Sequence, residues 1–264
     1  MRYNVKVTYY NNEIQISRYG YKIYRVDEEM KVKNVDNQTS VVSDKQSAVN
    51  RKKPAEDTDK NNKVRSERRS KQSIYEIARA NKWDYFATFT MSDNRYDYDS
   101  CKDRLRKFLN NFKSRKAVDL EYLVVPEQHK DGAWHFHGLL KGNIDAYLSE
   151  TWHKGRYELV GYNLGKCELE NVKDTNRVAS YITKYITKDL ANTVKNKRRY
   201  FYSKGVNKGK SVEMLIDRDI STIDFILGNF PEYDMTHIRT TEYNGNRIEY
   251  IQLKCTDSAE TQDS

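Results

Sequence analysis

The stretch that decides the fold runs from Tyr122 to Leu140 and reads YLVVPEQHKDGAWHFHGLL. Its two halves, Tyr122–Gln128 and Ala133–Leu140, are rich in β-branched and aromatic side chains, as strands are. The polar residues Lys130-Asp131-Gly132 lie between them and predict a tight turn. We therefore expect two antiparallel strands joined as a hairpin.

Two histidines lie two positions apart in the second of these strands. Because successive side chains of a strand point to opposite faces, His135 and His137 share one face while Trp134 and Phe136 share the other. One face is therefore expected to pack, and the other to bind a ligand. Two imidazoles on one face can hold a divalent ion together with at least one further ligand, often a carboxylate.

The length of the turn decides which residue is that further ligand. A three-residue turn with Gly132 at positive φ places Glu127 opposite His135, on the histidine face. A two-residue turn brings Gln128 opposite His135 instead. Glu127 is the predicted third ligand, with Gln128 as the alternative.

The elements around the hairpin predict an α+β sheet. Tyr85–Thr90 is strand-like, residues 99 to 115 form a lysine-rich helix with an apolar stripe, Asn143 begins a helix through Trp152, and Tyr157–Leu169 is strand-like again. A last helix begins at Asp174 and runs to about Leu190. This order favours a ferredoxin-like or RNA-recognition-like antiparallel sheet with flanking helices.

The last predicted helix carries two tyrosines four residues apart, Tyr181 and Tyr185, and such residues lie on one helix face. A phenol ionises near pH ~10, so as a nucleophile it needs a base or an activated electrophile. Lys184 is expected to neutralise a phosphodiester or steady a phenolate. For Lys188 a solvated helix face is an equally good interpretation.

Composition divides the rest of the chain. Residues 36–72 contain no aromatic side chain and consist mainly of Lys, Arg, Asp, Asn and Ser. This composition is typical of a segment that cannot bury a core. The predicted parts are an N-terminal β hairpin (1–35), a basic flexible linker (36–72), a catalytic domain (73–205), a C-terminal extension with a hairpin at Asn244-Gly245 (206–254) and a disordered tail (255–264).

Charge and cysteine content indicate the partner and the compartment. The 47 lysines and arginines exceed the 38 acidic residues and give a net charge of +9, which favours a polyanionic partner. No apolar run approaches the ~20 residues of a membrane-spanning helix, and the amino terminus lacks a secretory signal. The three scattered cysteines suggest a reducing cytoplasm. No P-loop pattern is present in the sequence.

Three motifs in order resemble those of the HUH endonucleases. They are Phe86-Ala87-Thr88-Phe89-Thr90, then Glu127 with His135-Phe136-His137, then Tyr181 and Tyr185 around Lys184. The two-tyrosine form looks like the gene A type of rolling-circle initiator of bacteriophages and plasmids. The resemblance covers about residues 83 to 205.

The resemblance implies a sheet of about five strands, with Mg²⁺ or Mn²⁺ held by the histidine pair and the tyrosine helix packed across the sheet. It also implies a nicking and joining endonuclease that forms a 5′-phosphotyrosine on an unpaired origin strand, served by host helicase and DNA polymerase. A conjugative relaxase or a transposase uses the same chemistry. A non-catalytic single-strand binder, stacking bases on the sheet, is the alternative from another class.

Overall fold

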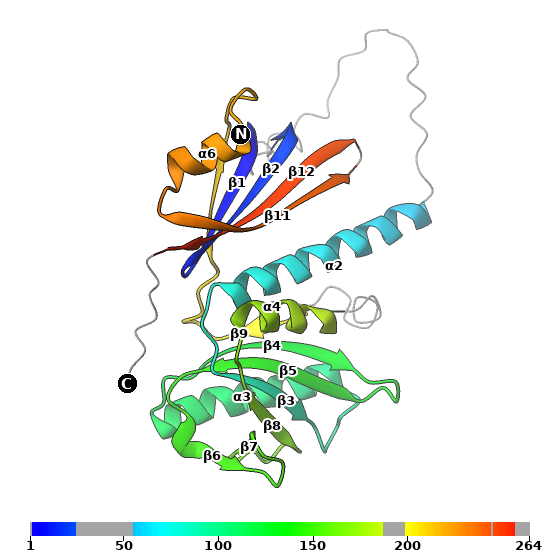
Figure 1. Ribbon diagram of the computed structural model, residues 1–264. Helices are drawn as coiled ribbons and strands as arrows, with labels where there is room; N and C mark the ends of the chain where they lie inside the picture. The colour runs from blue at the N-terminus through cyan, green and yellow to red at the C-terminus, as the bar shows by residue number, and fades with distance from the viewer. Residues whose placement is uncertain (1, 25–54, 187–198, 244, 257–264) are drawn as a thin grey trace, which may run out of the picture. The chain divides into compact units, whose positions relative to one another are not determined.

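The computed structural model describes residues 2–24, 55–186, 199–243 and 245–256 (Figure 1). They fall into two compact units, one within Lys53–Lys208 and the other from Met1–Lys52 and Gly209–Ser264. Each unit contains its own antiparallel sheet, which confirms the predicted α+β class. The structure has two sheets where the sequence predicted one sheet with small β additions.

The sheet of the first unit is built on the predicted hairpin. Its strands are β3 (Tyr85–Thr90), β4 (Glu121–Gln128), β5 (Trp134–Lys141), β6 (Leu148–Glu150), β7 (Arg156–Leu159), β8 (Cys167–Asn171) and β9 (Phe201–Tyr202). The order across the sheet is β6-β7-β8-β3-β5-β4-β9, with antiparallel neighbours throughout. It has seven strands rather than about five because the short strands β6 and β9 extend its edges.

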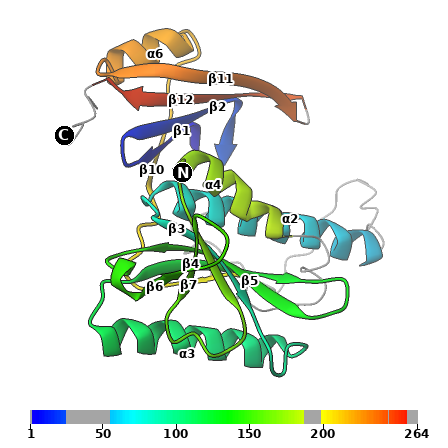
Figure 2. The same cartoon turned by 60° about the horizontal axis from the view of Figure 1, so that its bottom comes forward.

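Helices cover both faces of this sheet (Figure 2). Helix α3 (Tyr98–Lys116) lies on one face and buries an apolar side that includes Leu105, Leu109 and Phe112. Asp97 caps its first turn by accepting hydrogen bonds from two backbone N–H groups. Helices α2 (Ala55–Arg79) and α4 (Thr175–Ile182) lie side by side on the opposite face. The two faces are therefore supported by different parts of the chain.

Helix α2 corrects the linker predicted over residues 36–72. The chain is helical from Ala55 to Arg79, and residues 25–54 lie outside the described residues. Pairs one helical turn apart support this polar helix, including Lys71 with Glu67 at 2.8 Å. At its end Ile74 and Ile77 are buried in the core. Packing of this last part fixes a helix whose composition alone suggested no fold.

The helix predicted from Asn143 to Trp152 is wrong. Residues Asp145–Tyr147 form one turn of 3-10 helix, and the chain then becomes strand β6. The side chain of Asn143 accepts a hydrogen bond from the backbone N–H of Asp119 at 2.7 Å and so does not cap a helix. Pairing of β6 with β7 supplies hydrogen bonds to backbone groups that would otherwise have been bonded within a helix.

The second unit joins both ends of the chain in one sheet. Its elements are β1 (Arg2–Tyr10), β2 (Glu13–Tyr24), β10 (Lys210–Met214), α6 (Thr222–Asn229), β11 (Tyr233–Tyr243) and β12 (Asn246–Cys255). The strand order is β10-β1-β2-β12-β11, so the two predicted hairpins are present and pair with each other through β2 and β12. Gly245 has a φ of 70°, as the predicted turn requires.

A separate apolar core holds this second sheet to α6. Val7 and Ile16 from the strands are buried together with Phe225 and Phe230 from the helix region. The predicted disordered tail begins inside β12 at Cys255, and residues 257–264 lie outside the described residues. No helix among the described residues is long and apolar enough to cross a membrane.

Candidate active site

The hairpin of β4 and β5 has the register predicted from its turn. Gly132 has a φ of 88°, and the backbone N–H groups of Gly132 and His129 close the turn with hydrogen bonds of 2.9 Å. Glu127 pairs with His135 across the strands. Gln128 pairs with Trp134 on the other face, where its side-chain amide donates to the Gly132 carbonyl at 3.1 Å. The turn therefore places Glu127, and not Gln128, beside the histidines.

The two faces of β5 differ as the alternation predicts. Trp134 and Phe136 are buried on the face that α3 covers, and Trp134 packs against Tyr98 of that helix with ring centroids 4.9 Å apart. His135 and His137 lie on the opposite face, where His137 is only 6% exposed. Packing on one face thus fixes the orientation of the histidine face.

Glu127 and His137 form the closest polar contact on this face. The Nε2 atom of His137 lies 2.7 Å from Oε2 of Glu127. This hydrogen bond lowers the pKa of Glu127, against the opposing effect of burial. Burial, together with the neighbouring His129 and His137, lowers the pKa of His135. A carboxylate and neutral imidazoles are the protonation states that bind metal ions.

His129 is a site residue that the sequence interpretation missed. Its ring stacks on His135 with centroids 3.6 Å apart, and its Nε2 atom lies 3.9 Å from Oε2 of Glu127. The signal was present in the sequence, because His129 follows Glu127 by two positions and so shares its face. His153, by contrast, packs against Trp152 away from these residues.

Helix α4 and the turn after it present the two tyrosines to the histidine face. Asp174 caps the helix as predicted, accepting from the N–H groups of Asn176 and Arg177. The helix ends at Ile182, and a 3-10 turn, Thr183–Tyr185, follows it. The prediction of one helix to about Leu190 is therefore wrong within the described residues, and residues 187–198, which include Lys188, lie outside them.

An apolar stripe anchors this region to the sheet. Ala179, Ile182 and Ile186 are fully buried. Tyr181 and Tyr185 lie at the edge of this stripe. The 3-10 turn keeps both phenols on the side of the sheet, and the side chains meet there.

Tyr185 connects the tyrosine pair to the histidine face. Its ring stacks on His137 with centroids 3.5 Å apart, and its hydroxyl donates to the hydroxyl of Tyr181 at 2.9 Å. Burial and this hydrogen bond raise the pKa of Tyr185 well above its usual value. Tyr181 is 42% exposed, and Nζ of Lys184 lies 5.0 Å from the centroid of its ring. One phenol is therefore held and the other is accessible.

Strand β3 supplies two further residues to the site. The ring of Phe86 packs against Tyr181 at 5.4 Å and against His137 at 5.8 Å. The hydroxyl of Thr88 lies 3.3 Å from Nδ1 of His137 and orients the imidazole. The sequence predicted this strand but gave Thr88 no role, because a threonine on a strand looks the same whether or not it contacts a histidine.

The donor set on this face suits a divalent cation. Glu127, His135 and His137 supply one carboxylate and two imidazoles from two paired strands, a mixture that divalent transition metals and Mn²⁺ accept. The described residues contain no ready-made group of three or more His, Cys, Asp or Glu side chains around one point. Nε2 of His137 and the Glu127 carboxylate, two of these donors, lie within hydrogen-bonding distance of each other. The chemistry of the donors therefore fits a metal.

Comparison with known proteins links this face to a replication family. Residues 84–190 match the model of a protein family that is described as replication-associated protein ORF2 and its relatives. This match supports a replication-initiator family. The matched range contains β3, the histidine hairpin and the tyrosine helix. No curated protein and no solved structure matches the chain significantly.

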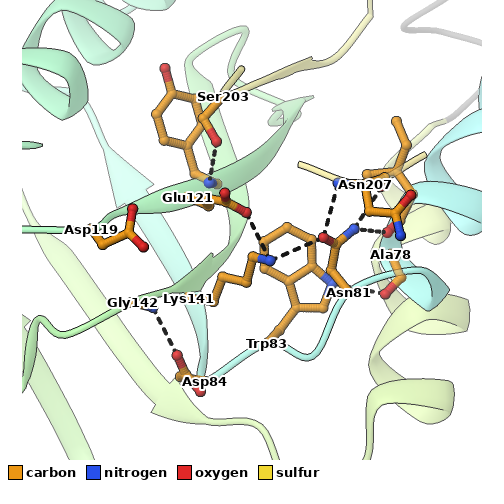
Figure 3. A network of polar contacts seen from close by, with 12 residues as sticks. Ala78, Asn81, Trp83, Asp84, Asp119, Glu121, Lys141, Gly142, Ser203 and Asn207 are labelled. Carbon is orange, nitrogen blue, oxygen red and sulfur yellow. Dashed lines mark hydrogen bonds and ion pairs between the residues drawn. The ribbon is translucent and has the colours of Figure 1, made fainter. Parts of the chain in front are cut away.

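Beyond the matched range the chain returns to the sheet through a polar network (Figure 3). The side chain of Asn81, at the end of α2, donates to the Asn207 carbonyl at 2.7 Å and accepts from Nζ of Lys141 at 3.1 Å. Lys141 also pairs with Glu121 at 2.8 Å. The Ser203 hydroxyl accepts from the backbone N–H of Tyr122 at 3.0 Å. These contacts hold the segment after β9 to the strands that carry the histidines.

Proposed function

We propose that this chain is a metal-dependent, tyrosine-nucleophile DNA nicking and joining enzyme that initiates rolling-circle replication. The observation that carries the proposal is the contact chain from Tyr181 through Tyr185 and His137 to Glu127, on one face of one sheet. The replication-family match over residues 84–190 supports the biological task. The site supports the chemistry.

In the proposed reaction a tyrosine hydroxyl attacks the scissile phosphorus of an unpaired strand. The phenolic oxygen forms a bond to phosphorus, the bond from phosphorus to the 3′ oxygen breaks, and the proton of the phenol is transferred to the departing oxygen. The products are a 5′-phosphotyrosine and a free 3′-OH. Because one phosphodiester replaces another, a later 3′-OH can reverse the step without ATP.

Glu127, His135 and His137 would hold Mg²⁺ or Mn²⁺, with Thr88 orienting His137 through Nδ1. When bound there, the ion supplies Lewis-acid polarisation of the phosphate and neutralises its charge. Lys184, whose ammonium lies beside the Tyr181 ring, adds a second positive charge near the phosphodiester. The positive charges compensate the charge that develops on the phosphate oxygens.

Tyr181 is the better first nucleophile. It is the more exposed phenol, and its oxygen accepts the hydrogen bond that Tyr185 donates. Burial, together with the hydrogen bond that it donates, raises the pKa of Tyr185 and makes that phenol the poorer nucleophile. Tyr185 would then take the new 5′ end after a round of synthesis, so that one protein serves successive rounds.

The replication-family match favours an initiator over a relaxase or a transposase with the same chemistry. The substrate would be a single-stranded origin, presented in a hairpin loop or at a nick site, because cleavage needs an unpaired strand. Host helicase and DNA polymerase would supply unwinding and synthesis, in the cytoplasm of a bacterial host.

The test uses labelled single-stranded oligonucleotides drawn from the replicon that encodes this chain, incubated with protein and either Mn²⁺ or EDTA. Denaturing gels should show a Mn²⁺-dependent covalent adduct that is lost in the Tyr181→Phe/Tyr185→Phe double variant. The single variants show which phenol reacts first, with Tyr181→Phe expected to lose the first cleavage. The control is Tyr21→Phe/Tyr24→Phe, which alters two exposed tyrosines of the other unit.

Three results would contradict the proposal. An adduct that persists in the double variant would place the nucleophile elsewhere. Cleavage that leaves free 5′-phosphate ends and no adduct would indicate a hydrolase that uses activated water. Binding without cleavage, on an oligonucleotide pool that covers the whole replicon, would indicate a single-strand binding module.

A further inference from the structure

A concave surface lies outside the candidate active site, between helix α3 and the connection from β7 to β8. It is a groove of about 490 Å³. From the helix its lining includes Arg104, Lys107, Phe108 and Arg115, and from the connection it includes Val160 and Asn163. Nothing in the mechanism proposed above uses these residues.

The lining of this groove is strongly cationic. It includes Arg104, Lys107, Arg115 and Lys116, and it contains no acidic residue. Arg104 is held in place by Asp93, whose backbone carbonyl accepts from Nη1 at 2.8 Å and whose carboxylate lies 3.8 Å from Nη2. No carboxylate of the described residues forms an ion pair with Lys107, Arg115 or Lys116. Uncompensated positive charges lining one groove attract a polyanion.

The groove also offers an aromatic ring and amide groups. Phe108 is partly exposed, and the edge-on ring of Tyr162 supports it at a centroid distance of 5.1 Å. The side-chain amides of Asn111 and Asn163 are exposed beside it. Phosphate-binding cations, a ring for stacking and amides for base edges are the groups that bind single-stranded nucleic acid.

The position of the groove connects it to the histidines. Helix α3 covers the sheet face opposite α4, so the groove and the tyrosines are on different sides of the sheet (Figure 2). The connection that lines the groove reaches the end of β3, where the Tyr162 hydroxyl donates to the Thr90 carbonyl at 3.1 Å. Thr90 pairs with His135. The groove therefore borders the strand end that carries the histidine site.

We propose that this groove binds the single-stranded DNA that flanks the scissile phosphate, beyond the nucleotides held at the tyrosines. The proposal rests on the proposed function for the identity of that strand. A single strand is favoured over a duplex because the Phe108 ring needs an unstacked base as its partner. It is favoured over an acidic peptide because the neighbouring site is proposed to act on a single strand.

Binding of fluorescent oligonucleotides in EDTA tests the groove without any chemistry. A short single strand that spans only the cleavage site is compared with one extended on both sides. Lys107→Ala/Arg115→Ala removes two exposed groove cations. Lys82→Ala/Lys154→Ala removes the same charge from exposed positions of the same unit outside the groove. Thermal melting checks that each variant remains folded.

For the long strand, the groove variant should weaken binding relative to wild type and make its salt dependence shallower by about 1.4 in log–log slope, because each neutralised phosphate of a single strand contributes about 0.7. Phe108→Leu, which keeps an apolar side chain, should weaken it by about fivefold or more through lost stacking. All variants should bind the short strand as wild type does. The control variant should also bind the long strand as wild type does.

The two proposals can fail separately. Equal binding of the long strand by wild type and groove variant, while wild type still forms the adduct, would overturn the groove and leave the nickase standing. Loss of long-strand binding in the groove variant, with no adduct from wild type, would support the groove and contradict the nickase. With duplex DNA and an acidic peptide as further labelled ligands, a loss of binding confined to either of them would overturn the single-strand assignment.

Discussion

The sheet within residues 53–208 has helices on both faces, whereas in the described part of the other unit one helix, α6, packs on one face of the sheet. Both sheets are antiparallel, and both carry histidine and tyrosine. In the first, α3 supports one face so that the other can hold the ring of Tyr185 over His137. In the second, His237 lies exposed on β11 beside Arg239. Residue type alone does not make a site.

The largest effect is expected from His137→Ala. This side chain contacts Tyr185, Glu127 and Thr88, so its loss removes the centre of the contact chain. Adduct formation should fall by well over ~100-fold, since loss of a mere partner of a metal ligand already costs ~10–100-fold. Gel analysis of the adduct measures this, with His237→Ala as the control. Undiminished adduct formation by the His137 variant would show that the first sheet, like the second, has no site at its histidine.

The two cores should also respond separately to cavities. Leu105→Ala in the first unit and Ile16→Ala in the second each empty a fully buried position. Each should destabilise its own unit by ~2–5 kcal/mol. Hydrogen exchange followed by mass spectrometry locates the loss, because protection should fall in the sheet that carries the substitution. Equal loss in both sheets after either substitution would show that the cores are one cooperative unit.

A smaller effect is expected from Thr88→Val, which keeps the shape of the side chain and removes the hydrogen bond to Nδ1 of His137. Adduct formation should fall by ~10–100-fold, the usual cost of losing a partner that orients a metal ligand. The matched control is Thr8→Val in the second sheet, where the hydroxyl contacts Ser211 at 3.0 Å. A metal titration separates positioning from structure, since the Thr88 variant should need more Mn²⁺ while its melting temperature stays close to wild type.

The smallest effect concerns the thiols. Burial raises the pKa of Cys167 to about 12 and also raises that of Cys101. Because the pKa of Cys167 is higher in the folded chain, its contribution to stability is present below about pH 8.5 and is lost as pH rises toward 12. At pH 8 a thiol reagent should react quickly with Cys255 alone, and Cys255→Ser should abolish that fast phase. Rapid reaction of two thiols in the folded wild-type protein would contradict the described core.

The histidine hairpin could be predicted because its information is local. A three-residue turn with glycine at positive φ fixes the register, and the register places Glu127 opposite His135. The cap at Asp174 and the turn at Gly245 are local in the same sense. Such features depend on a few neighbouring residues, so the sequence is sufficient to find them.

The helices were less predictable because their ends depend on distant contacts. The helix that begins at Thr175 ends at Ile182 and tightens into a 3-10 turn, although its apolar stripe continues through Ile186. Helix α2 forms from residues with little apolar content, and its end is buried through Ile74 and Ile77. Periodicity marks an apolar face but does not tell where tertiary packing stops a helix.

By itself the sequence determined the paired strands, the residues that share the histidine face and the two tyrosines one helical turn apart. Each follows from spacing along the chain, through the strand period of two and the helical period of ~3.6. Only the tertiary structure decided that Tyr185 stacks on His137, that Thr88 orients it and that β2 pairs with β12. These contacts join residues far apart in sequence, where no local period constrains the partner and burial selects it.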